Sequence, residues 1–170
     1  LLFENRAFSN YWFESGTPKF LIDLIMKKEY DITRLEDLES EVSIFESYEP
    51  DSLDVVALLF QTGYITLKER VSEEVYRLTY PNYEVKKSFL RHILRYMSDN
   101  REDMSYIRMM NRSLKEGNVD RFMELMKSLF AGIPYDITDR VSDREQHYQS
   151  LMYLVLALLG VDVRGEVRTN

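Results

Sequence analysis

Residues 145–160 read EQHYQSLMYLVLALLG, and residues 161–170 continue as VDVRGEVRTN. The first segment is long and apolar, which predicts a helix over about 143–159 that is nearly all buried. Gly160 marks its end, and the pattern after it predicts a β-strand at 166–170. A strand needs partners for its backbone N–H and C=O groups, and no earlier segment is an obvious partner. We therefore expect a sheet to follow Asn170 and interpret the chain as a fragment.

The composition excludes several classes of protein and site. Of the 170 residues, 45% are apolar and 30% are charged, which is typical of a globular protein. No apolar run is long enough to cross a membrane, so we expect no membrane partner. The lack of cysteine is compatible with the cytoplasmic location that we expect. The absence of cysteine excludes disulfides and thiolate metal sites. The two histidines, His92 and His147, lie far apart in sequence, which argues against a His-rich metal site or a Ser-His-Asp triad.

Two further patterns bear on the start of the chain and on nucleotides. The chain opens at Leu1 without an initiator Met and without the basic and apolar regions of a signal peptide. We therefore expect that Leu1 is an internal residue of a longer protein. The glycines are scattered, and no stretch resembles the phosphate-binding pattern G-x-x-x-x-G-K-S/T. We therefore expect no ATP binding by that route.

The first half of the chain predicts helices around a hairpin. Thr17-Pro18 begins a helix that ends near Lys28, and Asp51 or Ser52 caps a second helix that ends at Gly63. Residues 29–50 look acidic and irregular. Strands are predicted at 64–68 and 75–80, joined as a hairpin through residues 69–74. A helix capped by Asn82 follows at 83–97. Helix, hairpin and helix over 52–97 give the outline of a winged-helix-like unit.

The second half predicts only helices before the terminal strand. One helix covers about 104–115 and ends at Gly117, and Asn118 caps the next, which ends at Gly132. The expected fold is therefore mainly α: a helical array with a small β-hairpin and a terminal strand of a truncated α/β core. The broad apolar face of the last helix is expected to consist of Tyr148, Leu151, Met152, Val155, Leu158 and Leu159.

Charge is unevenly spread along the chain. The net charge of −7 argues against unaided binding of nucleic acid, because phosphate contact needs local Lys and Arg. Residues 29–54 carry a net charge of −9, whereas residues 84–127 carry a net charge of +3. The weakly basic segment is open to two interpretations, a contact with DNA or a solvated helix face of mixed charge. The hairpin loop at 69–74 is net acidic, which favours a connector over a nucleic-acid reader.

Glu145 has two interpretations that are compatible with each other. Ser142-Asp143-Arg144-Glu145 matches a capping box, in which the Glu145 carboxylate returns to the backbone N–H of Ser142. The sharper interpretation makes Glu145 a catalytic and metal-binding carboxylate on the first helix of a nuclease fold. His147 near the start of the same helix has no identifiable acid–base partner, so we expect a spectator role.

Five strings resemble a bacterial, Bacteroidetes-type family: FSNYWFESGTP (8–18), LLFQTGYIT (58–66), SLFAGIPYD (128–136), HYQSL (147–151) and EVRTN (166–170). That family joins an AAA-ATPase-like domain to a nuclease-like domain of the PD-(D/E)XK superfamily. The resemblance implies three regions: 1–30 as the end of the ATPase-like domain, 31–97 as a helical and winged linker, and 98–170 as the truncated start of the nuclease-like domain.

The resemblance also implies where chemistry would reside. Glu145 matches the first-helix acid, which in the superfamily joins an Asp and a Glu-x-Lys to hold Mg²⁺ beside a phosphate. Those partners are expected after Asn170, so the fragment itself holds no cofactor and is expected to be inactive. The fragment is expected to act as a non-catalytic connector or recognition region. The parent would hydrolyse phosphodiester bonds of nucleic acid with Mg²⁺. The alternative is a protein–protein interaction module with no nucleic-acid role.

Overall fold

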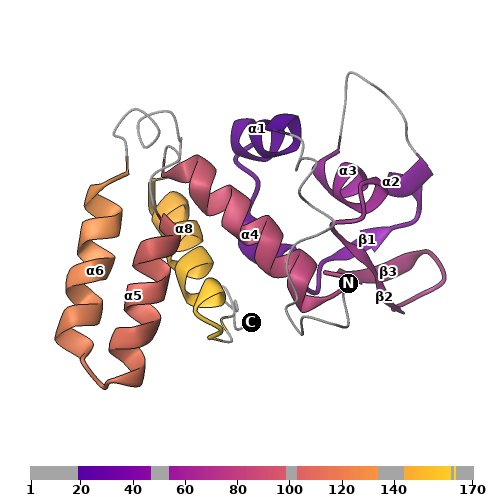
Figure 1. Cartoon of the computed structure of the whole chain (residues 1–170). Coiled ribbons are helices and arrows are strands. Elements are labelled where there is room, and N and C mark those ends of the chain that lie inside the picture. Colours follow the sequence, from indigo (N-terminus) through magenta and orange to yellow (C-terminus); the bar gives the residue numbers. More distant parts are fainter. Residues whose placement is uncertain (1–18, 47–53, 99–102, 134–143, 162, 164–170) are drawn as a thin grey trace, which may run out of the picture. The chain divides into compact units, whose positions relative to one another are not determined.

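The structure is a computed structural model that describes residues 19–46, 54–98, 103–133, 144–161 and 163. It is mainly α-helical with one small antiparallel sheet, as the sequence predicts (Figure 1). The described residues form two compact units. Unit 1 comprises residues up to 30 together with 34–89, and unit 2 comprises 31–33 and residues from 90 onward. Each unit is described by itself.

Unit 1 has the element order of a winged helix. Helix α1 (Lys19–Lys27) precedes strand β1 (Glu39–Glu41), helices α2 (Ser43–Glu46) and α3 (Val55–Gln61), and the hairpin of β2 (Thr66–Arg70) and β3 (Val75–Thr79). The sheet order is β1-β3-β2, and α3 packs against both α1 and α2. The predicted hairpin is confirmed, and β1, which lies before the predicted winged-helix-like outline at 52–97, adds a third strand to it.

Strand β1 corrects the expectation that residues 29–50 are irregular. Its three residues pair with β3 in antiparallel register, with Glu39 opposite Arg77 and Glu41 opposite Val75. Backbone bonds extend the pairing at both ends, because Leu78 N–H donates to Leu38 O at 2.8 Å and Val42 N–H donates to Glu74 O at 3.0 Å. A short 3₁₀ helix, η1 (Ile32–Arg34), precedes the strand. Tertiary pairing therefore orders an acidic segment of low strand propensity.

The N-cap of α3 is Asp54. Its Oδ1 accepts hydrogen bonds from the backbone N–H groups of Val56 at 2.7 Å and Ala57 at 3.1 Å, which satisfies two donors that the helix start leaves unpaired. The prediction of Asp51 or Ser52 as the cap was wrong, and both of those residues lie outside the described ranges. At the other end Gly63 adopts a φ of 78°, as its role of helix terminator requires.

An aromatic cluster lies in the core of unit 1. Phe89, on the first half of α4 (Tyr83–Met97), is fully buried, with its ring centroid 4.9 Å from that of Tyr64 and 6.1 Å from that of Tyr80. As predicted, Asn82 caps α4, because its Oδ1 accepts from Val85 N–H at 2.9 Å. Aliphatic residues from α1, α3, β3 and the segments that precede β1 and β2 complete this core: Leu21, Ile22, Ile25, Leu35, Val55, Val56, Leu59, Ile65 and Leu78.

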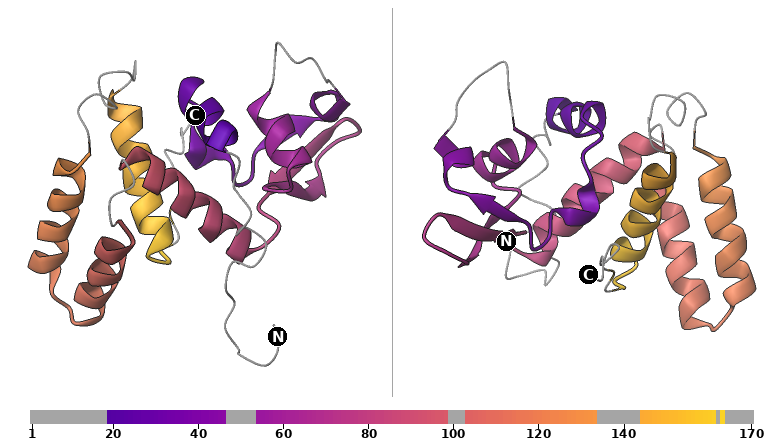
Figure 2. Two further views of the ribbon diagram at one scale, coloured as in Figure 1. Left: turned by 45° about the horizontal axis from the view of Figure 1, so that its top comes forward. Right: turned by 180° about the vertical axis from the view of Figure 1, so that it is seen from behind.

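Unit 2 contains helices of the chain's second half. Helices α5 (Asp103–Lys115) and α6 (Val119–Ala131) pack as a hairpin, and α8 (Arg144–Leu158) lies beside α5 in Figures 1 and 2. Asn118 caps α6 as predicted, since its Oδ1 accepts from Arg121 N–H at 2.9 Å. The Asn111 side chain reaches the carbonyl of Leu159 at 3.5 Å. None of the described helices is long and apolar enough to span a membrane.

Helix α8 confirms the predicted helix but presents a different buried face. Tyr148 is 46% exposed and Met152 is 38% exposed, so their assignment to the apolar face was wrong. The buried residues are His147, Ser150, Leu151, Tyr153, Leu154, Val155 and Leu158. Ser142, half of the predicted capping box, and the predicted strand at 166–170 lie outside the described residues.

Candidate functional site

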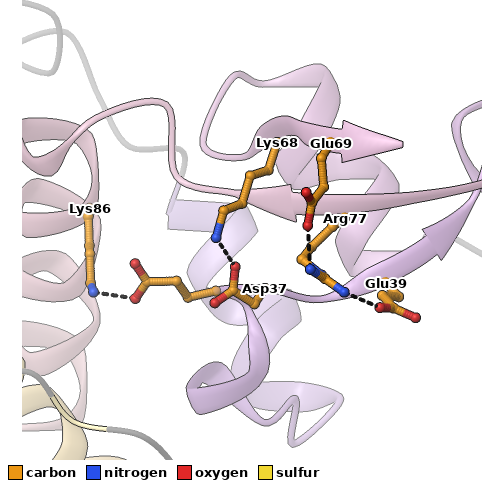
Figure 3. A network of polar contacts seen from close by, with 7 residues as sticks. Asp37, Glu39, Lys68, Glu69, Arg77 and Lys86 are labelled. Carbon is orange, nitrogen blue, oxygen red and sulfur yellow. Dashed lines mark hydrogen bonds and ion pairs between the residues drawn. The ribbon is translucent and has the colours of Figure 1, made fainter. Parts of the chain in front are cut away.

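Ion pairs connect the acidic segment before and within β1 to the hairpin and to α4. We call this surface the ion-pair row, and Figure 3 shows it from close by. Its acids come from the predicted irregular segment and from β2, and its cations come from β2, β3 and α4. The row consists of Glu36, Asp37, Glu39, Lys68, Glu69, Arg77 and Lys86.

Arg77 on β3 is shared between two carboxylates. Its Nη2 donates to Glu39 Oε1 on β1 at 2.7 Å, and its Nη1 donates to Glu69 Oε1 on β2. Both acids lie directly opposite Arg77 in the strand register, so the sheet itself brings the three side chains together. The hydrogen bond with Glu39, followed by the charges of Glu69, Glu39 and Asp37, raises the pKa of Arg77 above its ordinary value.

Two lysines pair with neighbouring residues of the acidic segment. Lys68 Nζ on β2 donates to Asp37 Oδ1, and Lys86 Nζ on α4 donates to Glu36 Oε2. Because Glu36 and Asp37 are adjacent in sequence, they hold cations from two different elements. Lys86 also lies 5.9 Å from the ring centroid of Tyr80, close enough for a cation–π contact.

Arg70 forms hydrogen bonds with the backbone of the hairpin turn. Its Nε donates to Ser72 O at 3.0 Å, and its Nη2 donates to Glu73 O at 2.8 Å. With Lys68 and Arg77 bound to carboxylates, each of the three cations on the hairpin strands has a partner within unit 1. A winged unit that reads nucleic acid needs cations directed at phosphate. Here the hairpin cations face carboxylates and backbone carbonyls.

Glu145 lies in the first turn of α8 and is exposed. Gln149 Nε2, one turn later, is 3.5 Å from Glu145 Oε1. No group of three or more acids or histidines that could hold a metal occurs in the described ranges. One exposed carboxylate does not make a magnesium site, because Mg²⁺ needs several oxygen ligands in octahedral geometry. The catalytic and metal-binding role of Glu145 therefore stays a prediction.

His147 is a buried side chain of α8. It is 6% exposed, and within the described part of the chain its Nε2 has no hydrogen-bond partner. Burial lowers its pKa below the ordinary value of 6.5. The pKa of His92 on α4 is also lowered, first by burial and then by the charges of Arg95 and Arg91. Among the residues that the structure describes, no acid is paired with His147 that would make it a general base.

Sequence reasoning missed the ion-pair row, although two signals pointed toward it. The acidic excess of residues 29–54 indicated that cations elsewhere should neutralise it, and the hairpin alternates Lys68, Glu69 and Arg70 with Arg77 on the returning strand. The partners could not be assigned, because the pairing depends on the register of a strand that the residue pattern does not predict.

The chain is similar to one curated bacterial protein, described as "Uncharacterized protein in vnfD 5'region" from Azotobacter chroococcum mcd 1. The two are 34% identical over 176 residues, which cover all of this chain. The chain spans only 34% of the length of that relative. No protein-family profile and no solved structure matches the chain.

Proposed function

We propose that this chain is a non-catalytic, cytoplasmic connector whose winged-helix-like unit contacts protein and not nucleic acid. The observation that carries the proposal is the pairing of all three hairpin cations inside unit 1. Lys68 and Arg77 are held by acids, and Arg70 is held by the turn. Helix α3, which packs against α1 and α2, adds no charge because its sequence is VVALLFQ.

Support for a connector also comes from length. The Azotobacter relative carries a similar segment within a protein about three times as long. For the longer protein to which this chain would belong, the resemblance of the five strings supports an ATPase-like and nuclease-like identity, with Mg²⁺-dependent hydrolysis of nucleic acid. In that setting the winged unit would join two domains, and Glu145 would be one acid of a site completed by other residues.

A separate protein partner is the second candidate. Leu67 on β2 and Val71 at the turn are each 44% exposed, which offers apolar contact area on the hairpin. These two side chains favour a contact with protein. They do not distinguish another domain from another chain, because scattered exposed apolar residues are common on protein surfaces.

Salt-dependent binding of DNA tests the proposal. We expect the 170-residue chain to show no binding to a fluorescein-labelled duplex, in fluorescence anisotropy, tighter than a Kd of about 10⁻⁴ M at physiological salt, the weak end of non-specific binding. A micromolar Kd that weakens steeply between 50 and 200 mM NaCl would contradict it.

A cleavage assay tests the non-catalytic part of the proposal. Incubation of the chain with plasmid DNA and Mg²⁺ should leave the plasmid supercoiled, and Glu145→Gln should behave identically. Nicking by the wild-type chain that Glu145→Gln abolishes would overturn the connector function and would identify Glu145 as catalytic.

A further inference from the structure

The acids of the ion-pair row cover cations that come from three elements of one winged unit. Lys68 lies on β2, Arg77 on β3 and Lys86 on α4, and Figure 3 shows their ion pairs next to one another. Four carboxylates face these three cations, so the row as a whole is slightly acidic. Without the acids of residues 36–39, the same surface would carry a local excess of positive charge.

We propose that residues 36–39 act as an internal polyanion, which occupies the positions that the phosphates of a duplex nucleic acid would otherwise take on this surface. The proposal rests on the connector function, since it explains why a winged unit with cations on three adjoining elements would not bind nucleic acid. It is an autoinhibitory contact built into the fold.

The energetics of the contact favour such a cover. The paired side chains are partly exposed: the two partners of the Lys68–Asp37 pair are 47% and 55% exposed, and those of the Arg77–Glu39 pair are 33% and 49% exposed. Exposed ion pairs are individually weak and are screened by salt. The cations of the row are thus accessible to solvent and are not shielded by burial. A competing polyanion is therefore excluded mainly by electrostatic repulsion from Glu36, Asp37 and Glu39.

The backbone keeps the cover in place independently of its charges. Asp37 N–H donates to Leu78 O at 3.0 Å, and Leu78 N–H donates to Leu38 O at 2.8 Å, so the segment stays attached to β3 when its carboxylates are neutralised. Amide substitutions should thus remove the repulsion without removing the strand. This separation of charge from structure makes the proposal testable by mutation.

The experiment compares two triple variants of the whole chain that have the same net charge. The uncovering variant, Glu36→Gln/Asp37→Asn/Glu39→Gln, frees Lys86 and Lys68 and leaves Arg77 paired with Glu69 alone. Glu41→Gln/Glu73→Gln/Glu74→Gln removes three acids of the same unit that contact none of the row's cations. Among described side chains, Glu41 interacts only with Ser43 Oγ, at 3.4 Å. Each variant changes the net charge from −7 to −4. Binding to the labelled duplex is measured between 50 and 200 mM NaCl.

We expect the uncovering variant to bind at least about tenfold more tightly than the control at 50 mM NaCl. Two freed lysines predict two phosphate contacts and a slope of log K against log salt of about −1.8, which is a loss of about 12-fold across that range. Adding Lys68→Gln to the uncovering variant should reduce both the affinity and the slope. Equal binding by the two triple variants would overturn the inference while leaving the connector function intact.

Folding of the variants is checked by circular dichroism. If the uncovering triple variant loses its helical signal, the double variant Glu39→Gln/Glu69→Gln, which frees Arg77 alone, replaces it. Its matched control is Glu41→Gln/Glu73→Gln. DNA binding by the wild-type chain itself would contradict the proposed function, and this result is distinguishable from equal binding by the variants.

Discussion

Arg77 and Glu39 lie directly opposite each other on β3 and β1, and the guanidinium Nη2 of Arg77 is 2.7 Å from Glu39 Oε1. This pair joins β1 to the hairpin of β2 and β3. Glu41, two residues further along β1, is also exposed but lies opposite Val75 and has no cation partner in the described part of the chain. The two glutamates thus separate the effect of the ion pair from the effect of charge on the strand.

Glu39→Gln should lower the thermal midpoint of the chain more than Glu41→Gln does. The first substitution weakens a hydrogen-bonded ion pair, whereas the second removes only an unpaired charge from an acidic surface. The difference should shrink in 1 M NaCl, since salt screens exposed pairs. Differential scanning calorimetry at low and high salt measures it, and identical midpoints at low salt would show that the pair contributes nothing.

The helices were largely predictable from the sequence, whereas β1 and the ion-pair row were not. Caps such as Asn82 and Asn118 and terminators such as Gly117 act through the backbone next to them, so local pattern suffices. Strand β1 contains Glu39, Ser40 and Glu41, which have no β-branched or aromatic side chain. It becomes a strand because β3 supplies backbone partners, and that information is tertiary.

The errors within predicted elements have local physical causes. Asp54 displaces Asp51 and Ser52 as the cap of α3, because the helix begins at Val55. On α8 a continuous run of apolar residues does not specify which face is buried, so Tyr148 and Met152 were assigned to the core although both are exposed.

Gly117→Ala should destabilise the chain by about 1 kcal/mol, since Gly117 has a φ of 69°, which an L side chain rarely adopts. Apart from Gly117 and its two chain neighbours, no atom of the described residues lies within 4 Å of an added Cβ, so the cost is conformational. Asn118 N–H donates to Ser113 O at 2.8 Å, which closes α5 and fixes this conformation. Gly132→Ala is the control, because Gly132 has a φ of −81°. Urea denaturation measures both, and equal losses would contradict the conformational explanation.

Phe89→Ala should cost about 3–5 kcal/mol of unfolding free energy, as is usual when a buried aromatic ring is removed. Phe89 is fully buried and contacts Tyr64 and Tyr80. Phe20→Ala on α1 is the matched control, because that ring is 48% exposed and its loss should cost less than about 1 kcal/mol. Urea unfolding followed by circular dichroism gives both values. A cost for Phe89→Ala no larger than that for Phe20→Ala would show that the cluster does not stabilise unit 1.

His147 should make the chain less stable as the pH falls below about 6.5. Burial lowers the pKa of His147 in the folded state, so between that pKa and the unfolded value of 6.5 the unfolded chain binds more protons. The stability that neutral His147 contributes is fully present above pH 6.5 and is lost as the pH falls through the folded pKa. His92 contributes with the same sign, so His92→Gln is the background in which His147→Gln is made. Thermal midpoints measured between about pH 7.5 and 5.5 should fall less steeply after His147→Gln, because carboxylates titrate mainly below that range. An unchanged slope would mean that the imidazole is hydrated or paired in the folded protein.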